Sequence, residues 1–137
     1  MSIQPDLDRI LAYRNSAVIT QYCLEHTEKS AEQALQIFQD LLAWLWLSEN
    51  RTRRQLQTHM IVPLAELDKM WHVFILHTRD YSAFCEEYFK RYLHHEVEQA
   101  GNEYTMATDE LSAFLGECYD YLGEAWLMRN FSSVLQA

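Results

Sequence analysis

The chain has 137 residues, of which 49% are hydrophobic and 23% are charged. This length and balance exclude a disordered chain and predict one soluble globular domain over residues 1–137. The formal net charge is −9, from 11 basic and 20 acidic residues, which disfavours binding to a nucleic-acid backbone. The longest uninterrupted apolar run, Leu41 to Leu47, is too short to cross a bilayer. We therefore expect neither nucleic acid nor membrane as a partner.

The scarcity of turn residues decides the fold class. Three glycines and two prolines are too few for the turns of an all-β protein. The sequence therefore predicts an all-α, single-domain bundle of five or six helices. Asp6 or Asp8 can cap a first helix that ends near His26. Ser30 and Gln33 then form an S-x-x-Q capping box, which opens a second helix that ends near Asn50.

The middle of the chain predicts a helical hairpin at about residues 64–95. A short helix over residues 55–61 and a turn at Pro63 precede a third helix, from Leu64 to about His77. Thr78 is the expected N-cap of a fourth helix, Arg79 to about Leu93. After a loop at residues 101–102, a last helix opens at Thr108 and ends near Gly123.

Polar residues with metal-binding chemistry gather between residues 67 and 97: His72, His77, Cys85, His94 and His95. At about 100° per residue, His72 and His77 lie about 140° apart around the third helix. Cys85 and His94 are separated by about 13 Å along a continuous fourth helix. The whole set therefore cannot form a single site.

Two smaller arrangements stay open. In a tight hairpin His72 comes level with Cys85, and Asp68, one turn earlier, can orient its imidazole. Separately, His94 and His95 end the fourth helix, where Glu98 follows. Each also has a structural interpretation, with Cys85 as a core thiol, His72 as a boundary residue and the histidine pair as a solvated helix end. Trp71 is expected to be a core anchor whose indole N–H finds one partner.

A set of motifs over residues 61–124 resembles the glycine-rich domain-containing protein-like family. The motifs are Val62-Pro63, D-x-x-W-H at residues 68–72, I-L-x-T at 75–78, Phe84-Cys85, His94-His95 and a later Leu122-Gly123-Glu124. The resemblance implies a compact helical domain, found alone in bacteria and attached to other modules in plants, with no established reaction. It makes Trp71-His72 and His94-His95 the preferred functional positions. One departure, Lys90 where that family usually has glycine, predicts an uninterrupted fourth helix.

The first functional hypothesis is a non-enzymatic helical domain that binds a protein partner or self-associates. Trp44 and Leu47 lie outside the apolar stripe of the second helix, which predicts cover on two sides or an exposed apolar patch. From Glu96 onward the sequence has eight acidic residues and only one basic residue, an arginine. Such an imbalance is typical of a docking surface for a basic partner. Three dispersed cysteines and an N-terminus without an apolar leader predict the cytoplasm.

The alternative hypothesis is a metal-binding protein or a metal-dependent hydrolase. His72 with Asp68 or Cys85, or else the pair His94 and His95 with a carboxylate, would supply the ligands, and zinc is the first choice for imidazole-rich ligation. The motifs H-E-x-x-H and G-x-S-x-G are absent, and no small-molecule ligand is identifiable. A cluster of three arginines is typical of a connector or of a partner for acidic side chains: Arg51, Arg53 and Arg54.

Overall fold

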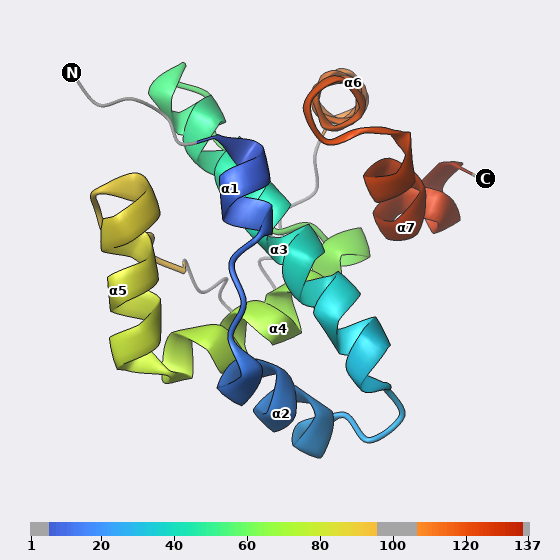
Figure 1. Ribbon diagram of the computed structural model, residues 1–137. Coiled ribbons are helices and arrows are strands. Elements are labelled where there is room, and N and C mark those ends of the chain that lie inside the picture. The colour runs from blue at the N-terminus through green and yellow to red at the C-terminus, as the bar shows by residue number, and fades with distance from the viewer. Residues whose placement is uncertain (1–5, 96–106, 136–137) are drawn as a thin grey trace.

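The computed structural model describes residues 6–95 and 107–135. These residues form seven α-helices and one 3₁₀ helix, with no strand among them (Figure 1). The elements are α1 (Leu7–Leu11), α2 (Ser16–Glu25), α3 (Ala31–Arg53), η1 (Val62–Leu64), α4 (Ala65–Leu76), α5 (Thr78–Phe89), α6 (Thr108–Leu122) and α7 (Glu124–Leu135). The predicted all-α class is confirmed, with more helices than expected. The loop expected at residues 101–102 lies outside the described residues.

The single helix expected at the N-terminus is wrong, because the chain breaks between α1 and α2. Asn15 caps α2 by accepting a hydrogen bond from the backbone N–H of Val18 at 3.2 Å. Tyr13, in the gap, packs its ring 4.9 Å from that of Phe84, between ring centroids, and also contacts Phe74. A local cap and a tertiary aromatic contact together override the apolar periodicity of residues 7–25.

Helix α3 runs through the middle of the molecule, with α5 on one side and α6 and α7 on the other (Figure 1). Its predicted capping box is present, because Ser30 and Gln33 each bond the other's backbone N–H. Contacts with α1, α2, α4 and α6 surround the helix, so Trp44 and Leu47 are buried. Both residues therefore belong to the core. Of the two expected outcomes, cover on two sides of the helix and an exposed apolar patch, the structure has the first.

The hairpin of α4 and α5 is confirmed, but its predicted ends are partly wrong. Residues 55–61 form no helix; Pro63 instead lies in η1, and Thr78 is the first residue of α5 rather than its N-cap. Helix α5 ends at Phe89, since Lys90 adopts the left-handed conformation, with φ 60°. The continuous helix expected through Leu93 is therefore interrupted.

The last predicted helix is confirmed as α6, and α7 follows it without having been predicted. Gly123, with φ 94°, joins the two helices. Arg129 donates two hydrogen bonds to the Asp40 carboxylate, at 2.8 and 3.0 Å, and the Trp126 indole N–H donates to the Asp40 carbonyl at 3.0 Å. These contacts fix α7 to α3. None of the described helices combines the length and the apolar character that a membrane span requires.

Candidate metal centre

The reversal at Lys90 places a short segment, residues 90–95, across α4; we call this segment the strap. A continuous helix would have carried residues 90–95 away from α4 along the axis of α5. Instead the ring of His95 lies 4.4 Å from the ring of Trp71, between centroids. The expectation that His94 and His95 end the fourth helix is therefore wrong, and the cause is the left-handed residue Lys90.

One buried and one partly buried polar contact hold the strap in place. The Tyr81 hydroxyl accepts a hydrogen bond from the Trp71 indole N–H at 3.0 Å and donates one to the Leu93 carbonyl at 2.5 Å. Arg91 donates two hydrogen bonds, at 2.7 and 2.9 Å, to Glu49 of α3, which is only 5% exposed. Trp71 thus is the core anchor that the sequence indicated, with one partner for its N–H.

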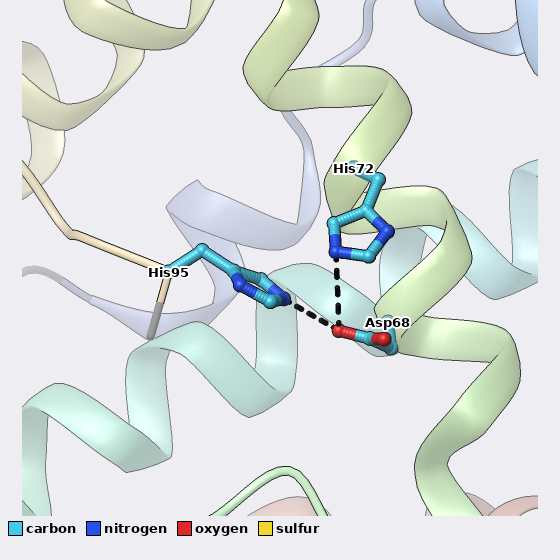
Figure 2. A group of neighbouring side chains, drawn as sticks. All are labelled: Asp68, His72 and His95. Carbon is cyan, nitrogen blue, oxygen red and sulfur yellow. Dashed lines mark hydrogen bonds and ion pairs between the residues drawn. The ribbon is translucent and has the colours of Figure 1, made fainter. Parts of the chain in front are cut away.

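The strap completes a cluster of two histidines and one carboxylate (Figure 2). Asp68 and His72 are four residues apart on α4 and share one face of the helix. The Nε2 atom of His95 is hydrogen-bonded to Oδ1 of Asp68 at 2.5 Å, and Nε2 of His72 lies 3.7 Å from the same oxygen. Figure 2 shows both imidazoles directed at this one oxygen. One potential ligand atom from each residue lies within 4.8 Å of the other two.

The electrostatics of the cluster favour an ionised carboxylate. The hydrogen bond from His95 lowers the pKa of Asp68, while partial burial acts in the opposite direction; the nearby His72 and His95 rings lower it further. Among the described residues Asp68 forms ion pairs with these two histidines and with no arginine or lysine. The negative charge needed for a metal ligand is therefore available at neutral pH.

The pairing of His72 with Cys85 that the hairpin suggested is not observed. Cys85 is buried beside Tyr81 and Leu93, and it is absent from the cluster that the described residues form. Burial raises the pKa of the Cys85 thiol, so the thiolate that binds metals is disfavoured. All three cysteines are free. Cys85 has the surroundings of a core thiol.

His94 and His95 are neighbours in sequence, but their side chains lie in different surroundings. The ring of His94 is exposed and lies 4.7 Å from the Tyr92 ring, between centroids. It faces a hollow that Trp44 and Trp71 also line, whereas His95 faces Asp68. Glu98, the carboxylate expected beside the histidine pair, lies outside the described residues. Of the five predicted binding residues, the structure brings together His72, His95 and the ring of Trp71.

The local sequence does not indicate this arrangement. Glycine is the residue typical of a left-handed helix end, whereas the residue that adopts this conformation here is Lys90. Interpreting lysine there as helix-continuing placed His95 on the wrong element. Tyr81 and Glu49 were missed as supports of the strap, since their contacts are 12 and 42 residues distant in sequence.

The spacing of the cluster suits a small transition-metal ion. Ligand atoms about 2 Å from a tetrahedral zinc ion stand about 3.3 Å from one another. From their present positions, Oδ1 of Asp68 and Nε2 of His95 would separate slightly and His72 would approach. The His72 side chain is 55% exposed, so its rotation meets little packing resistance.

Fold and site together define a class: an all-α protein whose described residues carry a two-histidine, one-carboxylate cluster. A family model described as UCP032817-like matches residues 7–118, and the chain belongs to this family. The resemblance to the glycine-rich domain-containing protein-like family is therefore wrong, because the matching family is a different, uncharacterised one that also includes α1 to α3. No curated protein and no solved structure gave a significant match.

Proposed function

We propose that this protein binds one divalent transition-metal ion through Asp68, His72 and His95, with zinc as the first choice. The observation that carries the proposal is the convergence of one ligand atom from each residue within 4.8 Å. Two of the three come from one helical face, and the third comes from the strap, which hydrogen bonds of Tyr81 and Arg91 hold in place. Imidazole nitrogen and carboxylate oxygen are the donor set that zinc and its neighbours in the series accept.

Three protein ligands leave a coordination position for water, which is typical of catalytic rather than structural zinc sites. Half of the His72 side chain is exposed, so solvent reaches the ligand set. A zinc ion in such a site lowers the pKa of its bound water toward neutrality and makes it a nucleophile. The reaction class that follows is metal-assisted hydrolysis.

The binding proposal is tested with cobalt and zinc on metal-free protein. Cobalt(II) reports its own ligand field in the visible spectrum, and zinc should displace it with one ion per chain. His72→Ala and His95→Ala each remove one ligand, and we expect affinity to fall at least about 100-fold in each. His94→Ala is the matched control, since His94 adjoins His95 in sequence but faces the hollow.

Two results would contradict the metal proposal. One is a wild-type protein that binds zinc and cobalt no better than the double variant His72→Ala/His95→Ala. The other is a His94→Ala variant that loses as much affinity as His95→Ala, which would mean that the strap as a whole, and not the cluster, determines binding.

A protein-interaction or self-associating role is a second proposal, now supported by different residues. Trp44 and Leu47 are buried and no longer argue for it. Glu117, one of the acids of the C-terminal third, binds Arg51 and Arg54 within the chain. Support comes instead from three large apolar side chains that are 68–78% exposed: Leu24, Val62 and Leu76. Sedimentation equilibrium tests self-association, and a Leu76→Ser variant that leaves an observed dimer unchanged would count against Leu76 as a contact.

A further inference from the structure

A second feature, separate from the metal cluster, is a hollow of about 150 Å³ where α1, α3 and α7 meet. Helix α3 contributes four residues that share one of its faces, at positions i, i+3, i+4 and i+7: Gln36, Gln39, Asp40 and Ala43. The rest of the wall comes from α1, from the end of α6 and from α7: Leu7, Leu11, Leu122, Trp126 and Arg129. None of the described residues of α4, α5 or the strap lines it. We call it the α3–α7 hollow.

The α3–α7 hollow has the size and the wall of a site for a very small molecule. A cavity of about 150 Å³ accommodates a molecule the size of benzene, with about six heavy atoms. Five of the nine lining residues are apolar: Leu7, Leu11, Ala43, Leu122 and Trp126. Apolar walls with a few polar groups at fixed positions are typical of ligand sites. We therefore expect a ligand with a short hydrocarbon part and one polar group.

The two charged residues of the wall favour a neutral ligand. Oδ1 of Asp40 accepts hydrogen bonds from Gln36 and Arg129, at 3.1 and 2.8 Å. Its Oδ2 atom accepts from Arg129 and Asn130, at 3.0 and 3.3 Å. Because a carboxylate has about four lone-pair sites, Asp40 has none left for a cation. Arg129 is the only cation among the lining residues and its charge is matched by Asp40, so an anion meets no net positive charge.

The polar groups that stay available are donors of Arg129 and acceptors of two glutamines. The Arg129 side chain is 41% exposed, and only two of the N–H groups of its guanidinium bond Asp40, so the others can donate. The amide nitrogens of Gln36 and Gln39 donate to the Asp40 carboxylate and to the Leu11 carbonyl. Since both partners can only accept, these bonds fix the orientation of the two amides. Their oxygens receive no hydrogen bond from the described residues and can accept one from a ligand.

We propose that the α3–α7 hollow binds a small neutral carboxamide. Its carbonyl oxygen accepts a hydrogen bond from Arg129, its N–H donates to the side-chain oxygen of Gln39, and its hydrocarbon part lies against Leu7 and Leu11. A carboxamide carries acceptor and donor on separate atoms, so one molecule can satisfy the guanidinium and a glutamine oxygen together. This site is independent of the proposed metal ion, because the two share no residue.

The test uses metal-free protein labelled with ¹⁵N-tryptophan, titrated with isobutyramide. Each indole N–H gives its own signal, and we expect that of Trp126, which lines the hollow, to shift and saturate while that of Trp71 stays in place. Two molecules of the same shape serve as comparisons. Methyl isopropyl ketone keeps the acceptor but has no donor, so it should bind about 5-fold more weakly. Isobutyrate has no donor either and brings a charge next to Asp40, so it should bind at least about 10-fold more weakly.

Two variants locate the site. Gln39→Leu removes one acceptor and should weaken isobutyramide about 5-fold while leaving the ketone, which donates nothing, unchanged. Gln21→Leu, at an exposed position on α2, is the matched control and should change neither. Ala43→Leu fills the hollow and should abolish the saturable response; because Ala43 is buried, Gln39→Leu is the milder variant that decides.

Four results would each overturn the proposal. They are a Trp126 signal that does not saturate, an equal shift of Trp71, isobutyrate that binds as tightly as isobutyramide, and unchanged isobutyramide affinity in Gln39→Leu. The metal titrations of the His72 and His95 variants are separate measurements, so the two sites can fail independently.

Discussion

The carboxylates of α3 and the carboxylate of the metal cluster on α4 are held in opposite ways. Asp40 and Glu49 on α3 are each 5% exposed, and each receives two hydrogen bonds from an arginine of a distant segment. Asp68 on α4 is more exposed and faces two imidazoles. An arginine keeps its charge at neutral pH and has no lone pair to offer a metal ion, whereas a neutral imidazole is a metal ligand.

This contrast separates carboxylates that fasten segments from one that is available for chemistry. The arginine pairs join α7 and the strap to α3, and in each pair the carboxylate is buried and accepts two hydrogen bonds from the guanidinium. Asp68 contributes a charge whose partners are themselves good metal ligands. Stability should therefore depend on the arginine pairs, and metal affinity on Asp68.

The largest stability effect is expected at Arg129. Arg129→Met leaves the buried Asp40 carboxylate without its charge partner, which should lower the free energy of unfolding by about 2–3 kcal/mol. Urea unfolding followed by circular dichroism measures the change. Arg79→Met, at an exposed position on α5, is the matched control. Equal losses in the two variants would mean that the Asp40 contacts do not fasten α7.

Substitution of Asp68 should have the opposite effect: a large loss of zinc affinity with little change in stability. Asp68→Asn removes the charged ligand but keeps the size of the side chain, so zinc affinity should fall about 100-fold, equivalent to about 2.7 kcal/mol. The free energy of unfolding of the metal-free protein should change by less than about 1 kcal/mol, since the asparagine side-chain oxygen can still accept the hydrogen bond from His95. Calorimetric zinc titration and urea unfolding give the two numbers. A large stability loss with unchanged affinity would invert the comparison.

Tyr81→Phe tests the support of the strap, with a smaller effect on both properties. The substitution leaves the Trp71 N–H and the Leu93 carbonyl without their partner, at a cost of about 1–2 kcal/mol. A looser strap should reduce zinc affinity about 10-fold, as is usual for groups that orient a ligand. Tyr88→Phe, on the same helix, is the control and should leave affinity unchanged; if it behaves like Tyr81→Phe, the strap is not held by the Tyr81 hydroxyl.

The smallest expected effect is a gain in stability. Lys90→Gly relieves a left-handed conformation that a lysine side chain disfavours, and we expect a gain of about 0.5–1 kcal/mol after the entropy of glycine is included. Glu86→Gly, inside α5, should instead destabilise the protein by about 1 kcal/mol. Thermal unfolding of both variants gives the comparison. A destabilised Lys90→Gly protein would mean that the lysine side chain itself contributes to the helix end.

The elements predicted correctly are those that local sequence determines. The capping box at Ser30, the start of α6 at Thr108 and the hairpin of α4 and α5 follow from caps and apolar periodicity. The break at residues 12–15 was missed because the packing of Tyr13 is tertiary. Helix α7 was missed since Gly123 was interpreted as the end of the last helix, whereas it connects two helices.

In the candidate site, too, the part that local sequence determines was predicted and the part that depends on tertiary structure was not. Asp68 and His72 were predicted to share a helical face, because a spacing of four residues is a local property. The position of His95 depends on the conformation of one residue, Lys90, and lysine carries no preference for φ 60°. The wrong helix end therefore kept His95 apart from His72, while the pairing of His72 with Cys85 came from the separate expectation of a tight hairpin.

The contacts of Asp40 with Arg129 also bear on the order in which the chain folds. They join residues 89 positions apart, so they can form only after a long loop has closed, at an entropic cost that increases with loop length. Helices α3, α4 and α5 follow one another in sequence, and their contacts close shorter loops. Helix α7 is thus expected to dock after α3–α5 and, on mild destabilisation, to exchange its amide hydrogens first.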